Sequence, residues 1–210
     1  MSAAPAELRQ VLEEAKTAGY LGPGPIEAHL THAAGFIATA EAALGRIPTN
    51  FCDLGTGGGV PGLALAIEWD QATGLLVDAN VRRAAFLREA VATLGLSERL
   101  EVLEERAEVV GRPGRCRETY ELVTARSFAG PAVTAEIAAG IVKVDGYLVV
   151  SDPPVPDDAR WPAAELQSVG FAPAELVVRA DAHFAVLRKA DPAPARYPRA
   201  VGKPGKRPLW

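Results

Sequence analysis

The sequence is poor in cysteine and histidine, with two cysteines and three histidines among 210 residues. Cys52 and Cys116 lie far apart in the chain, so they indicate neither a disulfide framework nor a zinc site, as is typical of the reducing cytosol. His29 and His32 lie one helical turn apart, a spacing that could hold a metal ion, but no third ligand is evident. We therefore interpret them as solvated or capping histidines and predict no metal site.

The sequence also lacks a long apolar run and an export signal. Residues 137–150 are interrupted by Lys143 and Asp145, so they are a poor candidate for a membrane span. Residues 1–16 contain acids and no apolar signal core. We expect a cytoplasmic protein that does not contact a membrane.

A general excess of positive charge is absent too. The net charge is −4, but residues 196–210 carry five basic side chains and no acid. The preceding 195 residues carry 17 basic and 26 acidic side chains, a net charge of −9. This distribution excludes a uniformly basic nucleic-acid-binding protein. It is compatible with a locally basic contact surface at the C-terminus.

A glycine-rich turn is the most informative feature that the sequence does contain. Residues 51–54 are typical of a short buried strand, and three glycines follow at alternate positions. Glycine allows positive φ and lets a ligand approach the backbone without meeting a Cβ. Pro61 then suits the first turn of a helix with an apolar body at residues 63–67, and a helix N-terminus favours an anionic group. The three glycines are Gly55, Gly57 and Gly59.

Two classes of cofactor compete for this turn. Asp53 and the three glycines form the Asp-x-Gly-x-Gly-x-Gly pattern of S-adenosylmethionine-dependent methyltransferases, whereas Gly57, Gly59 and Gly62 formally match the dinucleotide fingerprint. Asp78, which closes the next strand, suits either ligand because both carry ribose hydroxyls. The Asp53 carboxylate favours the methyltransferase because it can lie near the ammonium group of a methionine moiety. We predict S-adenosylmethionine as the cofactor, with the dinucleotide as the alternative.

Strand and helix patterns alternate along the chain, which predicts an α/β fold of the Rossmann-like class I methyltransferase type. We expect a mostly parallel sheet with a terminal antiparallel hairpin and an N-terminal helical appendage. The expected strands cover residues 51–54, 75–77, 100–103, 120–125, 147–151, 176–179 and 184–189. The expected helices cover residues 7–18, 26–44, 63–67, 80–94, 131–142 and 159–169. The predicted buried side of helix 80–94 is Val81, Ala84, Leu87, Val91 and Leu94.

The segment Asp152-Pro153-Pro154 resembles the signature of amino-group methyltransferases, which follows the fourth strand of that fold. Here it follows the expected fifth strand, and the fourth ends at residues 124–126. We therefore interpret it as a proline turn.

Several segments together resemble the bacterial 16S ribosomal RNA guanine-N7 methyltransferase family, also called glucose-inhibited division protein B. The similar segments are Asp53 to Gly62, Val77-Asp78 with residues 82–87, residues 106–108 (the family's adenine-side loop) and residues 123–129. A basic C-terminal signature is also similar, and it comprises Arg196-Tyr197-Pro198-Arg199, Gly202, Pro204, Lys206, Pro208 and Leu209. The N-terminal region departs from the family, because its Asn-Leu-Thr segment is absent and His32 stands where an acid is expected. That region should face the RNA, so the departure concerns the substrate more than the cofactor.

The resemblance implies methyl transfer to guanine N7, which carries a lone pair and needs no general base, so positioning supplies much of the acceleration. We expect Arg126 and Arg199 to orient the guanine or a phosphate through forked hydrogen bonds, and the alternative for Arg126 is a structural salt bridge. The expected cofactor-binding residues are Asp53, Gly55, Thr56, Gly57, Gly59, Pro61, Asp78, Ala79, Ala107, Glu108 and Arg126. The expected RNA-binding residues are Arg196, Tyr197, Arg199, Lys203, Lys206 and Arg207.

These predictions divide the chain into a helical appendage (1–48), a methyltransferase domain (49–195) and a basic tail (196–210). We expect a monomer that binds ribosomal RNA or the small ribosomal subunit. We also expect cofactor binding to survive truncation after Ala195 in part. Two other functions remain open: a small-molecule methyltransferase, and a catalytically silent protein that binds RNA or the ribosome.

Overall fold

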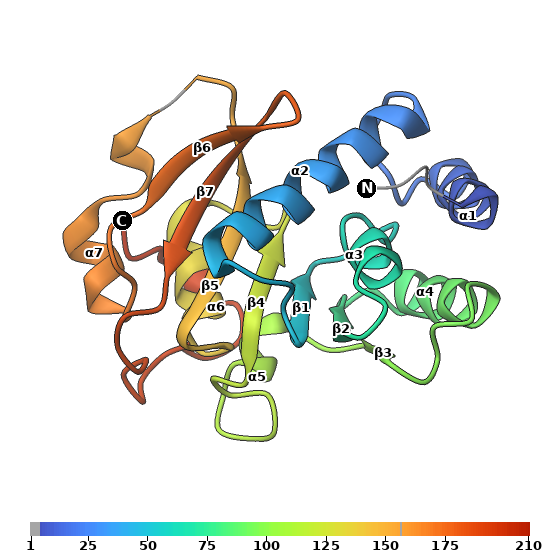
Figure 1. Ribbon diagram of the computed structural model, residues 1–210. Helices are drawn as coiled ribbons and strands as arrows, with labels where there is room; N and C mark the ends of the chain where they lie inside the picture. Colours follow the sequence, from blue (N-terminus) through green and yellow to red (C-terminus); the bar gives the residue numbers. More distant parts are fainter. Residues whose placement is uncertain (1–4, 156) are drawn as a thin grey trace.

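The computed structural model describes residues 5–155 and 157–210, and a seven-stranded sheet runs through its centre (Figure 1). The strand order is β3-β2-β1-β4-β5-β7-β6. Strands β1 to β5 pair in parallel, whereas β7 is antiparallel to both β5 and β6. The strands are β1 (Asn50–Leu54), β2 (Thr73–Val77), β3 (Leu100–Leu103), β4 (Tyr120–Ala125), β5 (Val142–Asp152), β6 (Glu175–Arg179) and β7 (Ala182–Arg188).

Each of the five parallel strands is followed by a helix, which confirms the predicted Rossmann-like arrangement with a terminal hairpin. The helices before the first strand are α1 (Ala6–Thr17) and α2 (Ile26–Leu44). The helices that follow the strands are α3 (Gly62–Glu68), α4 (Val81–Thr93), α5 (Ala107–Val110), α6 (Pro131–Ala139) and α7 (Ala163–Ser168). A short turn of 3-10 helix, η1 (Asp158–Arg160), precedes α7, and α8 (Lys203–Lys206) lies in the tail.

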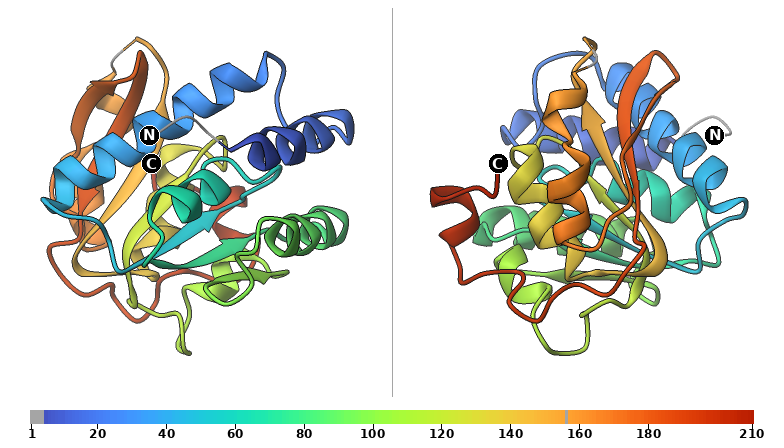
Figure 2. Two further views of the ribbon diagram at one scale, coloured as in Figure 1. Left: turned by 45° about the vertical axis from the view of Figure 1, so that its right-hand side comes forward. Right: turned by 90° about the vertical axis from the view of Figure 1, so that its left-hand side faces the viewer.

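Helices cover both faces of the sheet, as the right-hand view of Figure 2 shows for α2 and α6. Alternate residues of a strand point to opposite faces. In β1, Phe51 joins the core beneath α1 to α4, whereas Cys52 joins the core beneath α5 to α7. Leu76 and Leu75 of β2 divide in the same way. The parallel strands are thus buried on both faces, which explains their continuous apolar sequence.

Helix α2 packs against β5, β6 and β7, so the N-terminal appendage lies on the sheet. Burial of Leu8, Val11 and Leu12 on one side of α1 agrees with the predicted amphipathic pattern. Within the described part of the chain, no helix is both long and apolar enough to cross a membrane.

Three predicted details are wrong. Val81 is 64% exposed, because it is the first residue of α4 and projects beyond the buried side formed by Ala84, Leu87 and Val91. The helix expected at 131–142 ends at Ala139. Strand β5 begins at Val142, earlier than expected, because it extends beyond the apolar run that predicted it. The helix expected at 159–169 is divided into η1 and α7, since Pro162 has extended backbone geometry.

Candidate functional site

A cavity of about 260 Å³ opens at the carboxyl ends of the parallel strands. It lies where the strand order reverses between β1 and β4, which is where open α/β sheets bind their ligands. Its volume is near the lower end of small-molecule sites, about 300 Å³. The lining residues are Gly55, Val77, Asp78, Ala79, Glu105, Arg106, Ala107, Glu108, Phe128, Ala129, Val133, Ile137, Gly202 and Gly205.

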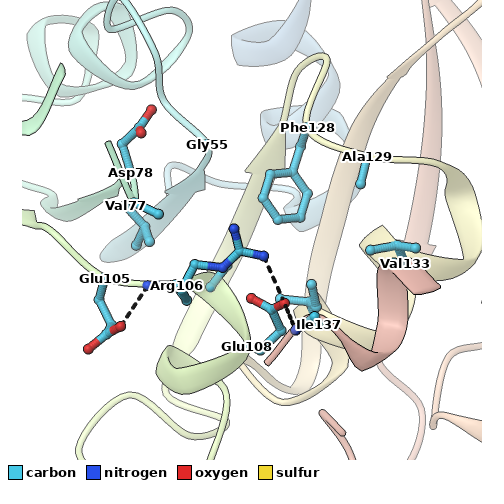
Figure 3. A pocket seen from close by; sticks show the side chains of 14 residues that line it. Gly55, Val77, Asp78, Glu105, Arg106, Glu108, Phe128, Ala129, Val133 and Ile137 are labelled. Atoms are coloured by element: carbon cyan, nitrogen blue, oxygen red, sulfur yellow. Dashed lines mark hydrogen bonds and ion pairs between the residues drawn. The ribbon is translucent and has the colours of Figure 1, made fainter. Parts of the chain in front are cut away.

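Asp78 supplies an oriented carboxylate at one side of this cavity (Figure 3). Its Oδ1 accepts a 2.9 Å hydrogen bond from the amide of Asn80, and its Oδ2 accepts a 3.0 Å hydrogen bond from the amide of Gly57. Arg83 lies 3.8 Å from Oδ2. Each oxygen keeps acceptor capacity toward the cavity, because a carboxylate has about four lone-pair sites. Asp78 therefore lines the cavity with a carboxylate of the kind predicted to bind ribose hydroxyls, and that function stays a prediction.

Glu108 closes the opposite side together with Arg106 and the tail (Figure 3). Its Oε1 accepts from Arg106 Nη2 at 3.1 Å and from the Gly202 amide at 2.9 Å. Burial opposes ionisation of Glu108, but the Gly202 amide and the Arg106 guanidinium outweigh it and hold the pKa below its usual value. The expected cofactor residues Ala79, Ala107 and Glu108 all line the cavity.

An apolar wall faces these charged groups. It includes Val77 at the end of β2, Phe128 after β4, and Val133 and Ile137 of α6. Gly55 has a φ of 65°, and a Cβ there would lie 2.6 Å from the Phe128 ring. This glycine is therefore required by close packing as well as by its backbone geometry.

Asp53 does not lie where we predicted it. Its carboxylate is 1% exposed and does not line the cavity. It accepts from the Thr124 hydroxyl at 2.8 Å and from the Gly62 amide at 3.1 Å, and burial raises its pKa to about 6. Thr56 is also buried, with its hydroxyl donating to the Asp53 carbonyl at 2.9 Å. Asp53 thus joins β1 to β4 and α3, whereas Thr56 bonds back to the backbone of β1.

The other predicted residues of the turn, Gly57, Gly59 and Pro61, lie outside the cavity lining. Gly57 has a φ of 60° and presents its amide to Asp78. Gly59 has a φ of 94° and packs against Leu63. Pro61 directly precedes α3, and none of these three residues lines the cavity. Their effect on a ligand is therefore indirect, through Asp78 and the position of Gly55.

A second and larger cavity, of about 530 Å³, lies beside the first. The two cavities share Phe128 and Ala129 as lining residues. Arg126 lines the second cavity and not the first, so its predicted contact with the cofactor does not match this geometry. The other lining residues are Pro23, Ala28, His29, His32, Ser127, Val150, Ser151, Asp152, Pro153 and Arg160.

Arg126 is half-buried, and burial lowers its pKa. Its Nη2 donates to His29 Nδ1 at 2.7 Å, and its Nη1 is buried without a hydrogen-bond partner among residues 5–155 and 157–210. No ion pair with an acid is formed by Arg126 in that part of the chain, so the alternative of a structural salt bridge finds no partner. A buried guanidinium nitrogen that lacks an acceptor is costly unless a ligand supplies one.

His29 is buried and caps none of the described helices, contrary to our interpretation, and His32 is half-buried. His29 is 5% exposed, and its Nε2 lies 3.2 Å from the Gly22 carbonyl. His32 packs its ring against Phe36 and Phe184, and burial followed by the charge of Arg126 lowers its pKa to about 4. In the described ranges, no group of three or more potential metal ligands is assembled.

Arg199 contacts a buried acid and not an open cavity. Its Nε lies 2.9 Å from Glu136 Oε1, its Nη2 lies 2.5 Å from Glu136 Oε2, and Glu136 is 0% exposed. Tyr197 is 8% exposed, and Arg196 lies over its ring, so neither presents a free stacking face. Lys203, Lys206 and Arg207 are exposed. The tail therefore has an anchored part and a solvent-facing basic part.

Several cavity residues were missed by sequence reasoning. Arg106 and Phe128 lie inside segments that had been identified by resemblance, but their side chains had been given no function. Gly202 and Gly205 come from the tail and also line the cavity, although Gly202 lies 94 positions after its partner Glu108. No local pattern predicts such a long-range approach. His29 had a visible signal in its spacing from His32, but we weighed only metal binding against a solvated or capping function.

Comparison with known proteins places these features in a family. Residues 26–152 match the family described as rRNA small subunit methyltransferase G. A curated ribosomal RNA small subunit methyltransferase G from Roseiflexus castenholzii is 37% identical over 182 residues, covering 83% of this chain and 77% of the relative. The protein of the same name from Synechococcus is 38% identical over 172 residues, covering 77% of this chain and 71% of the relative.

Solved structures share the fold at low sequence identity. An O-methyltransferase family protein from Burkholderia thailandensis has a TM-score of 0.56 at 15% identity, covering 79% of this chain and 58% of that chain. The structure of PigF with SAH has a TM-score of 0.58 at 17% identity, covering 75% of this chain and 54% of that chain. These similarities show the class I methyltransferase fold.

Proposed function

The chain belongs to the rRNA small subunit methyltransferase G family, and on that premise we propose that it transfers a methyl group to N7 of a guanine in 16S ribosomal RNA. S-adenosylmethionine-dependent methylation of ribosomal RNA follows from the membership itself. One observation supports the assignment of groups within the site: two cavities with different linings meet at Phe128 and Ala129. One cavity suits a cofactor, and the other suits an acceptor base.

The residues of the smaller cavity suit S-adenosylmethionine. Asp78 can accept hydrogen bonds from ribose hydroxyls, while Val77, Val133 and Ile137 offer apolar contacts for an adenine ring. Gly55 leaves room beside the Phe128 ring. When bound, the cofactor supplies a methyl group on a positively charged sulfur, which a lone pair can accept directly.

The larger cavity suits the acceptor because the cation Arg126 lines it, and the buried Nη1 of this side chain has no hydrogen-bond partner among the described residues. Guanine presents O6 and N7 as neighbouring acceptors, and arginine is the side chain that most often recognises them. Arg126 can hold O6 or an adjacent phosphate while N7 is directed toward Phe128 and the smaller cavity. No residue has to remove a proton, because N7 carries none, so the contribution of the chain is positioning.

The exposed cations Lys203, Lys206 and Arg207 suit contacts with RNA phosphates beside the cofactor cavity, which is lined by Gly202 and Gly205. The rest of the chain is acidic, so these contacts would offset repulsion locally. We further propose that the protein acts as a cytoplasmic monomer on the RNA of the small ribosomal subunit. The division into appendage (1–48), catalytic domain (49–195) and tail (196–210) remains part of this proposal.

The test is transfer of radiolabel from S-adenosylmethionine, using small ribosomal subunits and protein-free 16S RNA as acceptors. We expect label in 7-methylguanosine after digestion of the RNA to nucleosides. Arg126→Ala should lower the rate of methyl transfer by about 100-fold or more, with little change in cofactor affinity. Arg126→Lys should restore little of that rate, because an ammonium group cannot form the two parallel hydrogen bonds of a planar guanidinium group. Label in another nucleoside would contradict the N7 assignment, and label only in small molecules would contradict an RNA acceptor.

A further inference from the structure

We propose that His29 is a positioning residue that holds the Arg126 guanidinium group in the acceptor cavity. The inference rests on the proposed acceptor contact of Arg126. His29 belongs to α2, which precedes the first strand, whereas Arg126 directly follows β4. The contact between them therefore makes the N-terminal appendage part of the acceptor site.

The hydrogen bonds of His29 fix which ring nitrogen carries the proton. Its Nε2 lies 3.2 Å from the carbonyl of Gly22, which can only accept, so Nε2 must donate. In the neutral ring Nδ1 then presents a lone pair, and Arg126 Nη2 donates to it at 2.7 Å. The loop between α1 and α2 thus orients the imidazole, and the imidazole orients the guanidinium group.

This contact leaves the second terminal nitrogen of Arg126 without a hydrogen-bond partner in the described part of the chain. Its Nη1 is buried and makes no hydrogen bond within the described residues, although Arg126 lines the acceptor cavity. Arg160, which lines the same cavity, instead pairs with Asp152 at 3.1 Å. Arg126 is therefore fixed through a neutral partner, so its positive charge is not offset by a carboxylate in direct contact. Such a group can hold an oxygen or nitrogen acceptor of the base or phosphate.

The contact requires a neutral His29, because a doubly protonated imidazole has no lone pair for Arg126. The charged or titratable groups that face His29 are Lys16 of α1, His32 of α2 and Arg126 after β4. Burial, followed by the charge of Arg126, lowers the pKa of His29 below its ordinary 6.5. His29 is thus neutral at pH 7, and protonation at lower pH would remove the acceptor and repel the guanidinium group.

The experiment compares His29→Ala with His29→Asn in methyl transfer to small ribosomal subunits between pH 5 and pH 8. The Asn side chain can place an oxygen near the position of Nδ1 and does not titrate. We expect His29→Ala to lower kcat/KM for the RNA by about 10- to 100-fold, as for a misplaced substrate-orienting group, with cofactor affinity changed less than about twofold. His29→Asn should recover most of the loss. The wild type should lose activity as the pH falls through the lowered pKa of His29, which lies below 6.5, and His29→Asn should lose that dependence.

His183→Asn is the matched control, because His183 lies on β7 and does not line the acceptor cavity. It should retain both the activity and the acid dependence of the wild type. Equal losses in His29→Ala and His29→Asn, or an unchanged acid limb in His29→Asn, would overturn the proposal.

A second measurement separates this inference from the proposed function. The pKa of His29 is followed by NMR in the wild type and in Arg126→Ala, and it should rise when the cation is removed. An unchanged pKa would overturn the contact in solution, whatever the acceptor is. A wild-type protein that transfers no methyl group to RNA would instead contradict the proposed function, with the NMR result still deciding the contact.

Discussion

The backbone amide of Gly202 donates a 2.9 Å hydrogen bond to the Glu108 carboxylate, which joins the C-terminal tail to the cofactor cavity. Gly202 and Gly205 line that cavity, while Lys203 and Lys206 of the same segment face solvent. One short segment thus combines a wall of the cofactor site with a basic surface. The proposed RNA contact and the proposed cofactor site are therefore adjacent in this fold, although the segment lies far from the glycine turn in sequence.

Truncation after Ala195 should weaken cofactor binding. From the sequence alone we expected only that binding would survive this truncation in part, without a contribution of the tail to the cavity. The truncated chain loses two lining glycines and the hydrogen bond to Glu108, so we expect affinity for S-adenosylhomocysteine to fall by about tenfold or more, given the usual worth of a hydrogen bond to a charged group. Calorimetry measures the affinity, and Lys206→Ala in the full chain should leave it unchanged. Full affinity in the truncated protein would show that the tail is no part of the cofactor site.

Arg199→Ala should lower the free energy of unfolding by about 3–5 kcal/mol, because it leaves the fully buried Glu136 carboxylate without its charged partner. Arg199→Lys should recover only part, since one ammonium group cannot form both contacts. Denaturant unfolding measures the change, and Lys206→Ala should alter stability by less than about 0.5 kcal/mol. If Arg199→Ala instead keeps the stability of the wild type but loses methyl transfer, Arg199 contacts the acceptor, as predicted from the sequence.

Asp78→Ala should weaken S-adenosylmethionine binding by about 1–3 kcal/mol, the range for losing hydrogen bonds to a charged acceptor. The amides of Gly57 and Asn80 also lose their partner, so the turn itself becomes less ordered. Glu104→Ala is the control, because Glu104 pairs with Arg88 and does not line the cavity. Titration calorimetry that finds equal affinities for Asp78→Ala and the wild type would remove Asp78 from the cofactor site.

Neutralising Lys203, Lys206 and Arg207 should weaken RNA binding and flatten its dependence on salt. Each lost phosphate contact is expected to reduce the slope of log affinity against log salt concentration by about 0.7–0.9. Affinity measured at several salt concentrations gives the slope. Arg88→Ala on α4 removes an exposed cation elsewhere and should keep the slope of the wild type. If neutralising Lys203, Lys206 and Arg207 also leaves the slope of the wild type unchanged, the basic part of the tail makes no phosphate contact.

The sequence predicts this fold well because its strands are apolar runs and its turns carry glycine or proline. The position of Asp78 and Glu108 beside the cavity was predictable because parallel strands bring their carboxyl ends to one edge of the sheet. Asp53 shows the limit of motif reasoning, since the pattern identifies a carboxylate and cannot tell whether it points to a ligand or to Thr124. The Arg126 contact with His29 and the Arg199 contact with Glu136 join residues separated by 97 and 63 positions, and tertiary packing alone determines them.

The central claim, methylation of guanine N7 in 16S ribosomal RNA, is tested most directly by nucleoside analysis of that RNA from cells with and without this gene. We predict that 7-methylguanosine falls by one residue per 16S molecule when the gene is deleted. The wild-type gene should restore it, and the Arg126→Ala gene should not. An unchanged content of 7-methylguanosine in the deletion strain would contradict the account.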